Sequence, residues 1–130
     1  MTVPLKIKTT SPFGVTEFAL NEALERDVIP YPTVSATVTA SATQTQAGAT
    51  ALTSHRNLIT TVTTTGDAVL LPVIVVGLEC WVRNAGANQA KVFPRSGAKI
   101  NGGAADASSN LNAGIAARFV AIDSTSWWSY

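Results

Sequence analysis

The clearest pattern along the chain is an alternation with period two over residues 34–53, which is the period of a β-strand. Its small apolar side chains are Val34, Ala36, Val38, Ala40 and Ala42, and its hydroxyl side chains are Ser35, Thr37, Thr39, Ser41 and Thr43. Inward side chains this small would let a partner backbone approach closely, as at a packed subunit axis. A flexible Ser/Thr/Ala linker is the alternative interpretation.

Short apolar runs follow, each closed by residues typical of turns. The runs are 57–63, 69–71, 78–83, 89–93, 98–100 and 115–122, and the turn residues between them include Gly66-Asp67, Pro72, Pro94, Asn101-Gly102 and Asp123-Ser124. Turn signals at roughly 8 to 12 residue spacing predict an all-β protein, a compact, jelly-roll-like β-sandwich. Asn101-Gly102 is the strongest hairpin signal, because a type I′ turn needs positive φ at both central residues.

Two of these runs predict what faces the core. In 78–83, Leu78, Cys80 and Val82 would point inward, which leaves Trp81 outside and in need of a cover. The run 115–122 is apolar on nearly both faces, so it is either a central strand or part of a subunit contact. The residues expected at a subunit interface are Val34, Val38, Trp81 and Val120.

Residues 1–33 differ from the rest and predict an N-terminal arm for attachment, followed by a β-sandwich body over 34–130 that is expected to oligomerise. The arm holds four of the six prolines and four of the eight acidic residues. Leu20, Leu24 and Val28 would line one face of a short helix over 17–27 that Pro30 and Pro32 would end. Side chains expected to dock the arm on the body, on a neighbouring subunit or on a larger partner are Phe13, Phe18, Leu20 and Leu24.

Composition narrows the classes of partner. Only 13% of the 130 residues are charged and the net charge is +1, which disfavours binding to nucleic acid or to a membrane surface. Much of the 46% hydrophobic fraction is alanine, so the core is expected to be thin and oligomerisation is favoured. The single cysteine, Cys80, excludes an intrachain disulfide. Neither an export signal nor a membrane-spanning run is recognisable, so we expect a soluble protein.

The sequence offers only weak candidates for catalytic residues. A Ser/His/Asp arrangement would need His55 together with Asp67 or Asp123, and a symmetric trimer would have to place three His55 side chains on its axis to form a site there, but spacing alone shows neither. Ser96 and Lys99 fit a Ser-x-x-Lys pattern without its companion motifs. One histidine and one cysteine cannot close a zinc shell. We therefore expect no catalytic residue, no metal, no cofactor and no small-molecule substrate, and predict that the protein is not an enzyme.

The chain ends in the most concentrated aromatic feature, Trp127-Trp128-Ser129-Tyr130. In a strand, Trp128 and Tyr130 would share one face, so this pair is expected in the core and Trp127 at the surface. A stacking platform for sugar, formed by Trp127 or Trp128 together with the outward Trp81, is the functional alternative.

Several segments together resemble a recurrent module of tailed-bacteriophage virion proteins. They are Gln46-Ala47-Gly48-Ala49-Thr50-Ala51-Leu52, Asn57-Leu58-Ile59-Thr60-Thr61-Val62, Gly66-Asp67-Ala68-Val69-Leu70-Leu71-Pro72, Val82-Arg83-Asn84-Ala85-Gly86-Ala87-Asn88, Val92-Phe93-Pro94-Arg95-Ser96-Gly97, Ile100-Asn101-Gly102, Leu111-Asn112-Ala113-Gly114 and Ser126-Trp127-Trp128. The module is similar to parts of capsid decoration (cement) proteins, head fibers and tail fibers. The resemblance covers about residues 44–130 and brings no catalytic residue.

What the resemblance implies is a β-sandwich that trimerises, with an N-terminal region that attaches it to the particle. We therefore expect a decoration protein that binds as a homotrimer to the major capsid protein on the outer head and stabilises the shell. It would be made in the cytoplasm of the host bacterium and end on the virion surface. The alternatives are a short head or tail fiber, an adhesin that binds host-surface glycan, and a minor tail or baseplate plug.

Overall fold

The computed structural model describes residues 35–130, and the predicted arm, including its docking residues, and Val34 lie outside that range. The described part holds ten strands and no helix, which confirms the all-β class. The strands are β1 (Ser35–Thr39), β2 (Thr50–Ala51), β3 (Arg56–Thr61), β4 (Ala68–Leu70), β5 (Glu79–Asn84), β6 (Ala90–Phe93), β7 (Lys99–Ile100), β8 (Ser109–Leu111), β9 (Ala116–Asp123) and β10 (Ser126–Ser129).

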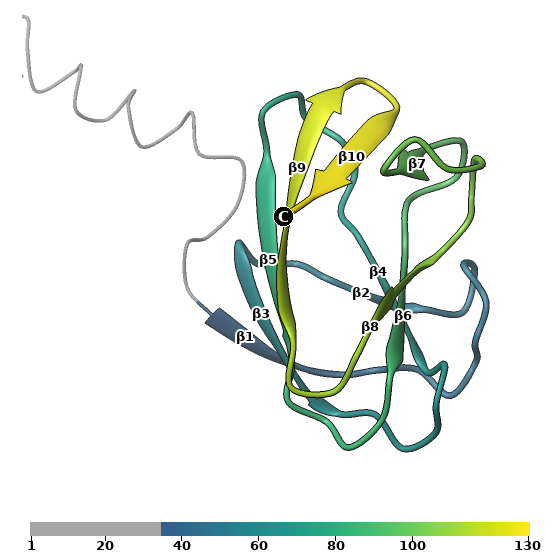
Figure 1. The fold of residues 1–130 in the computed structure, drawn as a ribbon, viewed down its shortest axis with the longest axis vertical. Coiled ribbons are helices and arrows are strands. Elements are labelled where there is room, and N and C mark those ends of the chain that lie inside the picture. The colour runs from purple at the N-terminus through teal and green to yellow at the C-terminus, as the bar shows by residue number, and fades with distance from the viewer. Residues whose placement is uncertain (1–34) are drawn as a thin grey trace, which may run out of the picture. The chain divides into compact units, whose positions relative to one another are not determined.

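The ten strands form two sheets that face each other (Figure 1). A six-stranded sheet has the order β1-β3-β5-β9-β10-β7, and a four-stranded sheet has the order β2-β4-β6-β8. The core lies between them, and its largest fully buried side chains include Trp127, Phe119, Leu52, Ile59 and Leu71.

The connectivity is that of a β-solenoid over the first six strands. They alternate between the two sheets, and from β3 on each pairs in parallel with the strand two places earlier: β3 with β1, β5 with β3, β4 with β2 and β6 with β4. Ser35 therefore lies beside Arg56, and Arg56 beside Trp81. Stacking of one coil on the next is how solenoids bury a core.

The prediction of a jelly-roll-like β-sandwich is wrong, because the sheets of such a sandwich are built from antiparallel neighbours, whereas β1 to β6 pair in parallel. Turn spacing shows where strands end. It does not show which strands pair, and a coil that changes sheet at every turn has the same spacing as a sandwich.

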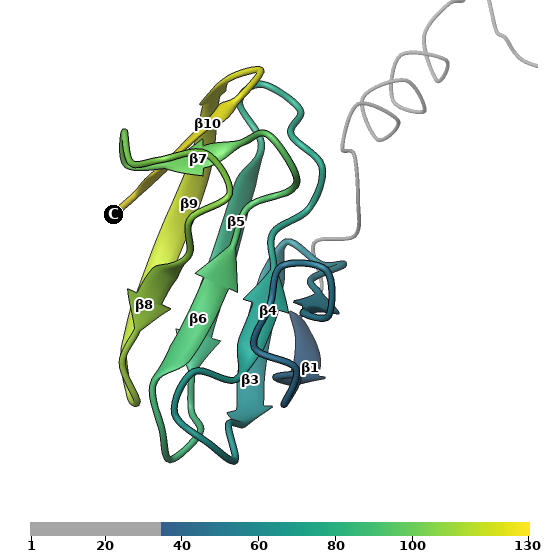
Figure 2. The same cartoon turned by 90° about the vertical axis from the view of Figure 1, so that its right-hand side faces the viewer.

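The last four strands close one end of the coil (Figure 2). β8 runs antiparallel to β6, β9 antiparallel to β5, and β10 antiparallel to β9. β7 then forms the edge of the larger sheet, parallel to β10. The first rung, β1 and β2, supplies the edge strands at the other end.

The alternation over 34–53 corresponds to a shorter strand than expected. β1 ends at Thr39, Ser41 makes an isolated bridge with Ala68, and the chain returns to a strand only at Thr50. Val38 and Ala40 are buried in the core cluster. Val38 therefore packs inside the body, away from the surface at which a subunit contact was expected.

The Asn101-Gly102 turn forms as expected but joins different strands. Both residues have positive φ, 54° and 73°, and the Gly103 amide donates to the Ile100 carbonyl at 3.0 Å. The strands on either side do not pair, because β7 belongs to the larger sheet and β8 to the smaller one. The turn chemistry predicted the local geometry correctly and the hairpin wrongly.

Asn84 links the two sheets where the coil ends. Its side chain is fully buried at the end of β5, and its Nδ2 donates to the carbonyls of Asn88 and Leu111, both at 2.9 Å. Its Oδ1 accepts from the Gly86 amide at 2.9 Å. Since Leu111 belongs to β8, this one amide ties the last parallel rung to the closing strands.

Candidate interaction surface

The acidic residues considered for catalysis hold turns. Asp67 is buried before β4, and its carboxylate accepts from the amides of Thr63 and Thr64 at 3.0 Å and from the Gln44 side chain at 3.3 Å. His55, the candidate partner, precedes β3, and its carbonyl accepts from the Trp81 amide. The Asp67 carboxylate oxygens therefore accept hydrogen bonds that hold the loop before β4.

Asp106 and Asp123 hold exposed turns in the same way. The Gly97 amide, 2.7 Å from the Asp106 carboxylate, holds the pKa of that carboxyl below its usual range, and the Gln46 side chain adds to the effect. The Thr125 amide lowers the pKa of Asp123 similarly. Ser96 and Lys99 lie in and after a turn rather than on a helix.

Residues 35–130 contain neither a grouped set of metal ligands nor a membrane-spanning helix. No three His, Cys, Asp or Glu side chains in this range are grouped as a metal ion requires. Nor does any helix in it have the length and hydropathy of a membrane crossing. Cys80 is fully buried, so its thiol cannot reach a second chain without opening the core.

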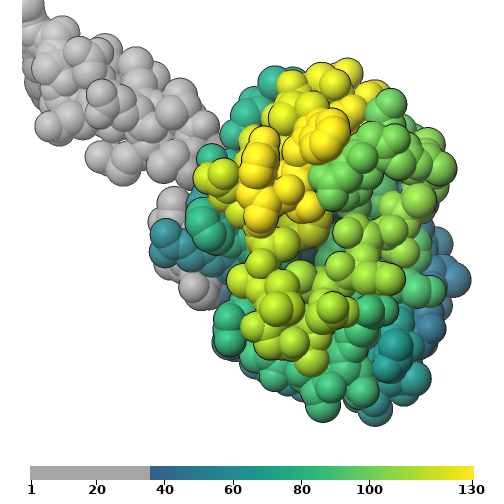
Figure 3. Space-filling view, viewed as in Figure 1, coloured from purple at the N-terminus to yellow at the C-terminus, as the bar shows by residue number. Residues whose placement is uncertain are grey.

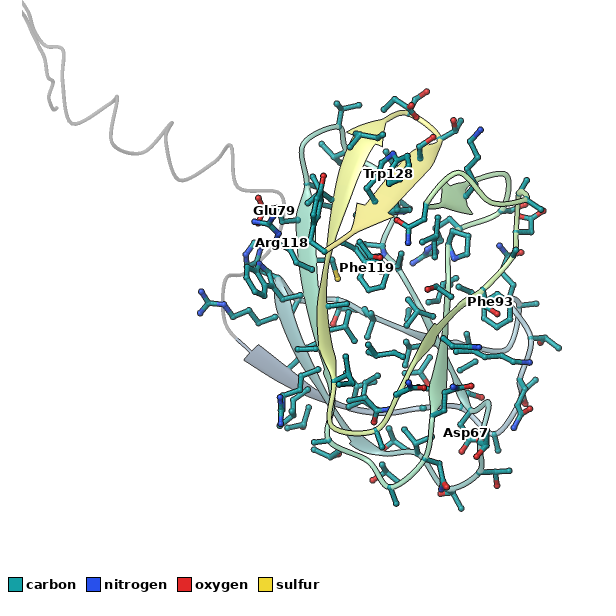
Figure 4. The ribbon with its side chains drawn as sticks, viewed as in Figure 1. Asp67, Glu79, Phe93, Arg118, Phe119 and Trp128 are labelled. Carbon is teal, nitrogen blue, oxygen red and sulfur yellow. The ribbon has the colours of Figure 1, made fainter. Side chains whose placement is uncertain are left out.

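The most distinctive surface lies on the side of the six-stranded sheet that faces away from the core, here called the outer face. Because Asn57, Cys80, Val82, Phe119 and Trp127 point inward, their neighbours along each strand point outward. Figure 4 shows Arg118 and Glu79 pointing away from the body and Phe119 pointing into it. The outer face comprises Arg56 and Leu58 on β3, Glu79, Trp81 and Arg83 on β5, Arg118, Val120 and Ile122 on β9, and Trp128 and Tyr130 at the chain end.

One row of the outer face alternates cations and aromatic rings across neighbouring strands. Arg56 lies opposite Trp81, and Trp81 opposite Arg118. The backbones of Arg118 and Tyr130 exchange two hydrogen bonds, at 3.0 and 2.9 Å, which completes the row. Arg118 sits between the two aromatic side chains, with its guanidinium carbon 5.7 Å from the centre of the Trp81 ring and 5.0 Å from that of Tyr130.

This stacking gives the row a defined geometry. Each cation–π contact at such an exposed site stabilises by about 0.5–1 kcal/mol, and the paired strands fix both rings relative to Arg118. The Asn57 side chain adds a further restraint, since its Nδ2 donates to the Trp81 carbonyl at 3.2 Å and to the Ser54 carbonyl at 2.8 Å. Trp81 nevertheless remains 41% exposed, which agrees with its predicted outward position.

Beside Trp81 the outer face is hollowed by a shallow depression of about 360 Å³. Leu58, Trp81, Val82 and Ala116 are among the residues that line it. Arg56 and Arg83 also line it, from two neighbouring strands and at diagonal positions, because Arg56 pairs with Trp81 and Arg83 with Leu58. A mainly apolar depression with two arginines in its lining suits a group that is part apolar and part anionic.

The C-terminal aromatics face opposite to the expected arrangement. Trp127 is fully buried and Trp128 and Tyr130 point outward, 40% and 69% exposed. β10 pairs with both β9 and β7, and its Trp127 side chain is fully buried. The number of aromatic side chains on each face of a strand does not predict these pairings, so it could not predict which face is buried. Trp127 therefore cannot stack on a sugar, whereas Trp128 keeps an exposed ring.

The end of the chain is fastened to the Asn101-Gly102 turn. The Asn101 side chain donates to the Ser129 hydroxyl and accepts from the Ser129 amide, both at 2.8 Å. The Trp128 ring approaches to 4.0 Å of where a Cβ on Gly102 would lie. In Figure 3 the C-terminal segment and the segment that carries β7 form one continuous surface.

Of the residues predicted for a subunit interface, Trp81 and Val120 lie together on the outer face, and Val120 pairs with Glu79 of β5. Sequence reasoning did not assign the arginines of this face to a site. Part of the signal was present, because Arg83 and Arg118 stand at outward positions of the expected runs 78–83 and 115–122, whereas Arg56 directly precedes the run 57–63. Their convergence depends on the pairing of β5 with β3 and with β9.

Comparison with known proteins identifies no relative: no family model, no curated protein and no solved structure matches this chain.

Proposed function

We propose that this protein is a structural component of a tailed-bacteriophage virion, a capsid decoration (cement) protein. In this proposal it binds the outer surface of the head as a homotrimer and stabilises the shell. The resemblance of residues 44–130 to phage virion modules suggests the particle, and the outer face is the observation that carries the binding role.

The composition of the outer face supports a role in binding proteins. Trp, Tyr and Arg are the residue types that dominate the energetics of protein interfaces. Here Trp81, Arg118 and Tyr130 lie in one row with their geometry set by backbone pairing and ring stacking. A preorganised surface of this kind loses little conformational entropy on binding. A trimer would present three copies, so that weak individual contacts add up.

The test uses the full chain with purified heads that lack it. Bound protein is measured by sedimentation with the heads, and shell stability by the temperature at which DNA is released. The proposal expects saturable binding in multiples of three and a raised release temperature. Absence of binding to heads, together with a monomeric mass in solution, would refute it.

An adhesin is the second candidate, supported by the exposed rings of Trp81 and Trp128 on one face. Binding to a glycan array that Trp128→Ala abolishes would favour it. Trp127→Ala is not informative for this question, because Trp127 belongs to the core.

A further inference from the structure

We infer that the depression beside Trp81 binds carboxylate side chains of a protein partner, and that the partner is a different protein rather than a second copy of this chain. The inference deepens the proposed function, since it rests on the outer face as the binding surface and specifies the chemistry of what covers it.

Basic and acidic side chains are unequal in number on the outer face. Residues 35–130 contain six basic side chains, of which Arg56, Arg83 and Arg118 stand on the outer face against one acidic residue, Glu79. Lys91 projects from β6 of the other sheet, where its neighbours Ala90 and Val92 are buried. Three of the six basic side chains of residues 35–130 therefore stand on this one sheet surface, all of them arginines, whereas Lys91, Arg95 and Lys99 are not part of it.

Two arginines line the depression. Arg56 pairs with Trp81 and Arg83 with Leu58, so the two arginines occupy diagonal positions of the outer face, with Trp81 and Leu58 at the other two corners. Arginine binds carboxylates through two parallel hydrogen bonds, which a lysine cannot make. The depression thus offers two carboxylate positions on either side of an apolar contact.

The arginines of the outer face favour a different protein over a second copy of this chain as the partner. Two copies that met through this face would each bring Arg56, Arg83 and Arg118 to the contact, and like charges facing each other are destabilising. The contacts of a homotrimer join two different surfaces of neighbouring copies, so a trimer does not require the outer face to meet its own copy. The row also spans four strands, roughly 15 Å at the usual spacing of strands. A flat surface of that width matches a protein surface better than a single small ligand.

The experiment compares two substitutions that change net charge equally. Arg83→Glu reverses a charge at the depression, and Lys91→Glu reverses one on the opposite sheet. The full chain, each variant and Arg83→Gln, as a milder version, are tested for binding to immobilised poly-L-glutamate at increasing NaCl, with circular dichroism to confirm folding. We expect Arg83→Glu to weaken binding by at least about tenfold and Lys91→Glu by less than about twofold.

Several results would overturn the inference. Equal weakening by Arg83→Glu and Lys91→Glu would mean that net charge alone governs binding. Tighter Arg83-dependent binding to polygalacturonate than to poly-L-glutamate would assign the depression to an acidic sugar. A wild-type chain that does not bind poly-L-glutamate would remove the carboxylate partner altogether.

The same variants separate this inference from the proposed function. If Arg83→Glu decorates heads as fully as the wild type, the inference fails and the decoration role stands. If the wild type ignores heads but binds poly-L-glutamate through Arg83, the decoration role fails and the carboxylate site stands.

Discussion

Replacement of Asn84 by alanine should destabilise the protein far more than its single side chain would suggest. The side chain makes three hydrogen bonds in a fully buried position, two as donor and one as acceptor. A net contribution of about 1 kcal/mol per hydrogen bond gives a loss of about 3 kcal/mol. Because Asn84 joins β5 to β8, the loss acts at the junction between the coil and its closing strands.

The assay is thermal denaturation followed by tryptophan fluorescence, to which the buried Trp127 contributes together with the exposed Trp81 and Trp128. For a domain near 100 residues, 3 kcal/mol corresponds to a fall in Tm of about 12–24 °C. Asn110→Ala is the matched control, because Asn110 lies one residue from Leu111 and is exposed, and its loss should stay within about 0.5 kcal/mol. If Asn84→Ala also stays within that limit, the link between the sheets is not what holds the closing strands.

Three further substitutions test other parts of the fold. Trp127→Ala should cost about 3–5 kcal/mol in the free energy of unfolding, whereas Trp128→Ala, one residue away but exposed, should cost less than about 1 kcal/mol; similar losses would contradict the observed facing of β10. Gly86→Ala should lower Tm, since a Cβ there would lie 2.8 Å from the Val62 amide nitrogen, and an unchanged Tm would show that this loop can shift. The pKa of the Asp106 carboxyl is lowered in the folded state, so its contribution to stability is present above the ordinary carboxyl pKa of 3.8 and is lost as pH falls through the folded-state pKa. Asp106→Asn should therefore reduce the fall in Tm below about pH 3.8. If the fall in Tm with acid is the same in the variant, the hydrogen bond from the Gly97 amide does not stabilise the turn.

The local features of the fold were largely predictable from sequence. The inward positions of Leu78, Cys80 and Val82 follow from period two, and the positive φ of Asn101 and Gly102 follows from turn chemistry. These are properties of neighbouring residues, and the sequence records neighbours directly.

Strand partners were not predictable in the same way. A period-two run looks the same whether its neighbour is parallel or antiparallel, so the sequence does not distinguish the solenoid connectivity of β1 to β6 from a sandwich. The row from Arg56 to Tyr130 depends on those partners, so the sequence does not predict that its members lie together. The side on which Trp127 lies depends likewise on the pairing of β10 with β9 and β7.

The outer face as the binding surface is tested most directly by a density map of phage heads decorated with this protein. The account predicts a homotrimer in which the row of Trp81, Arg118 and Tyr130 is covered by an acidic surface of the major capsid protein. A map in which the four-stranded sheet contacts the shell, and this row faces solvent in every copy, would contradict it.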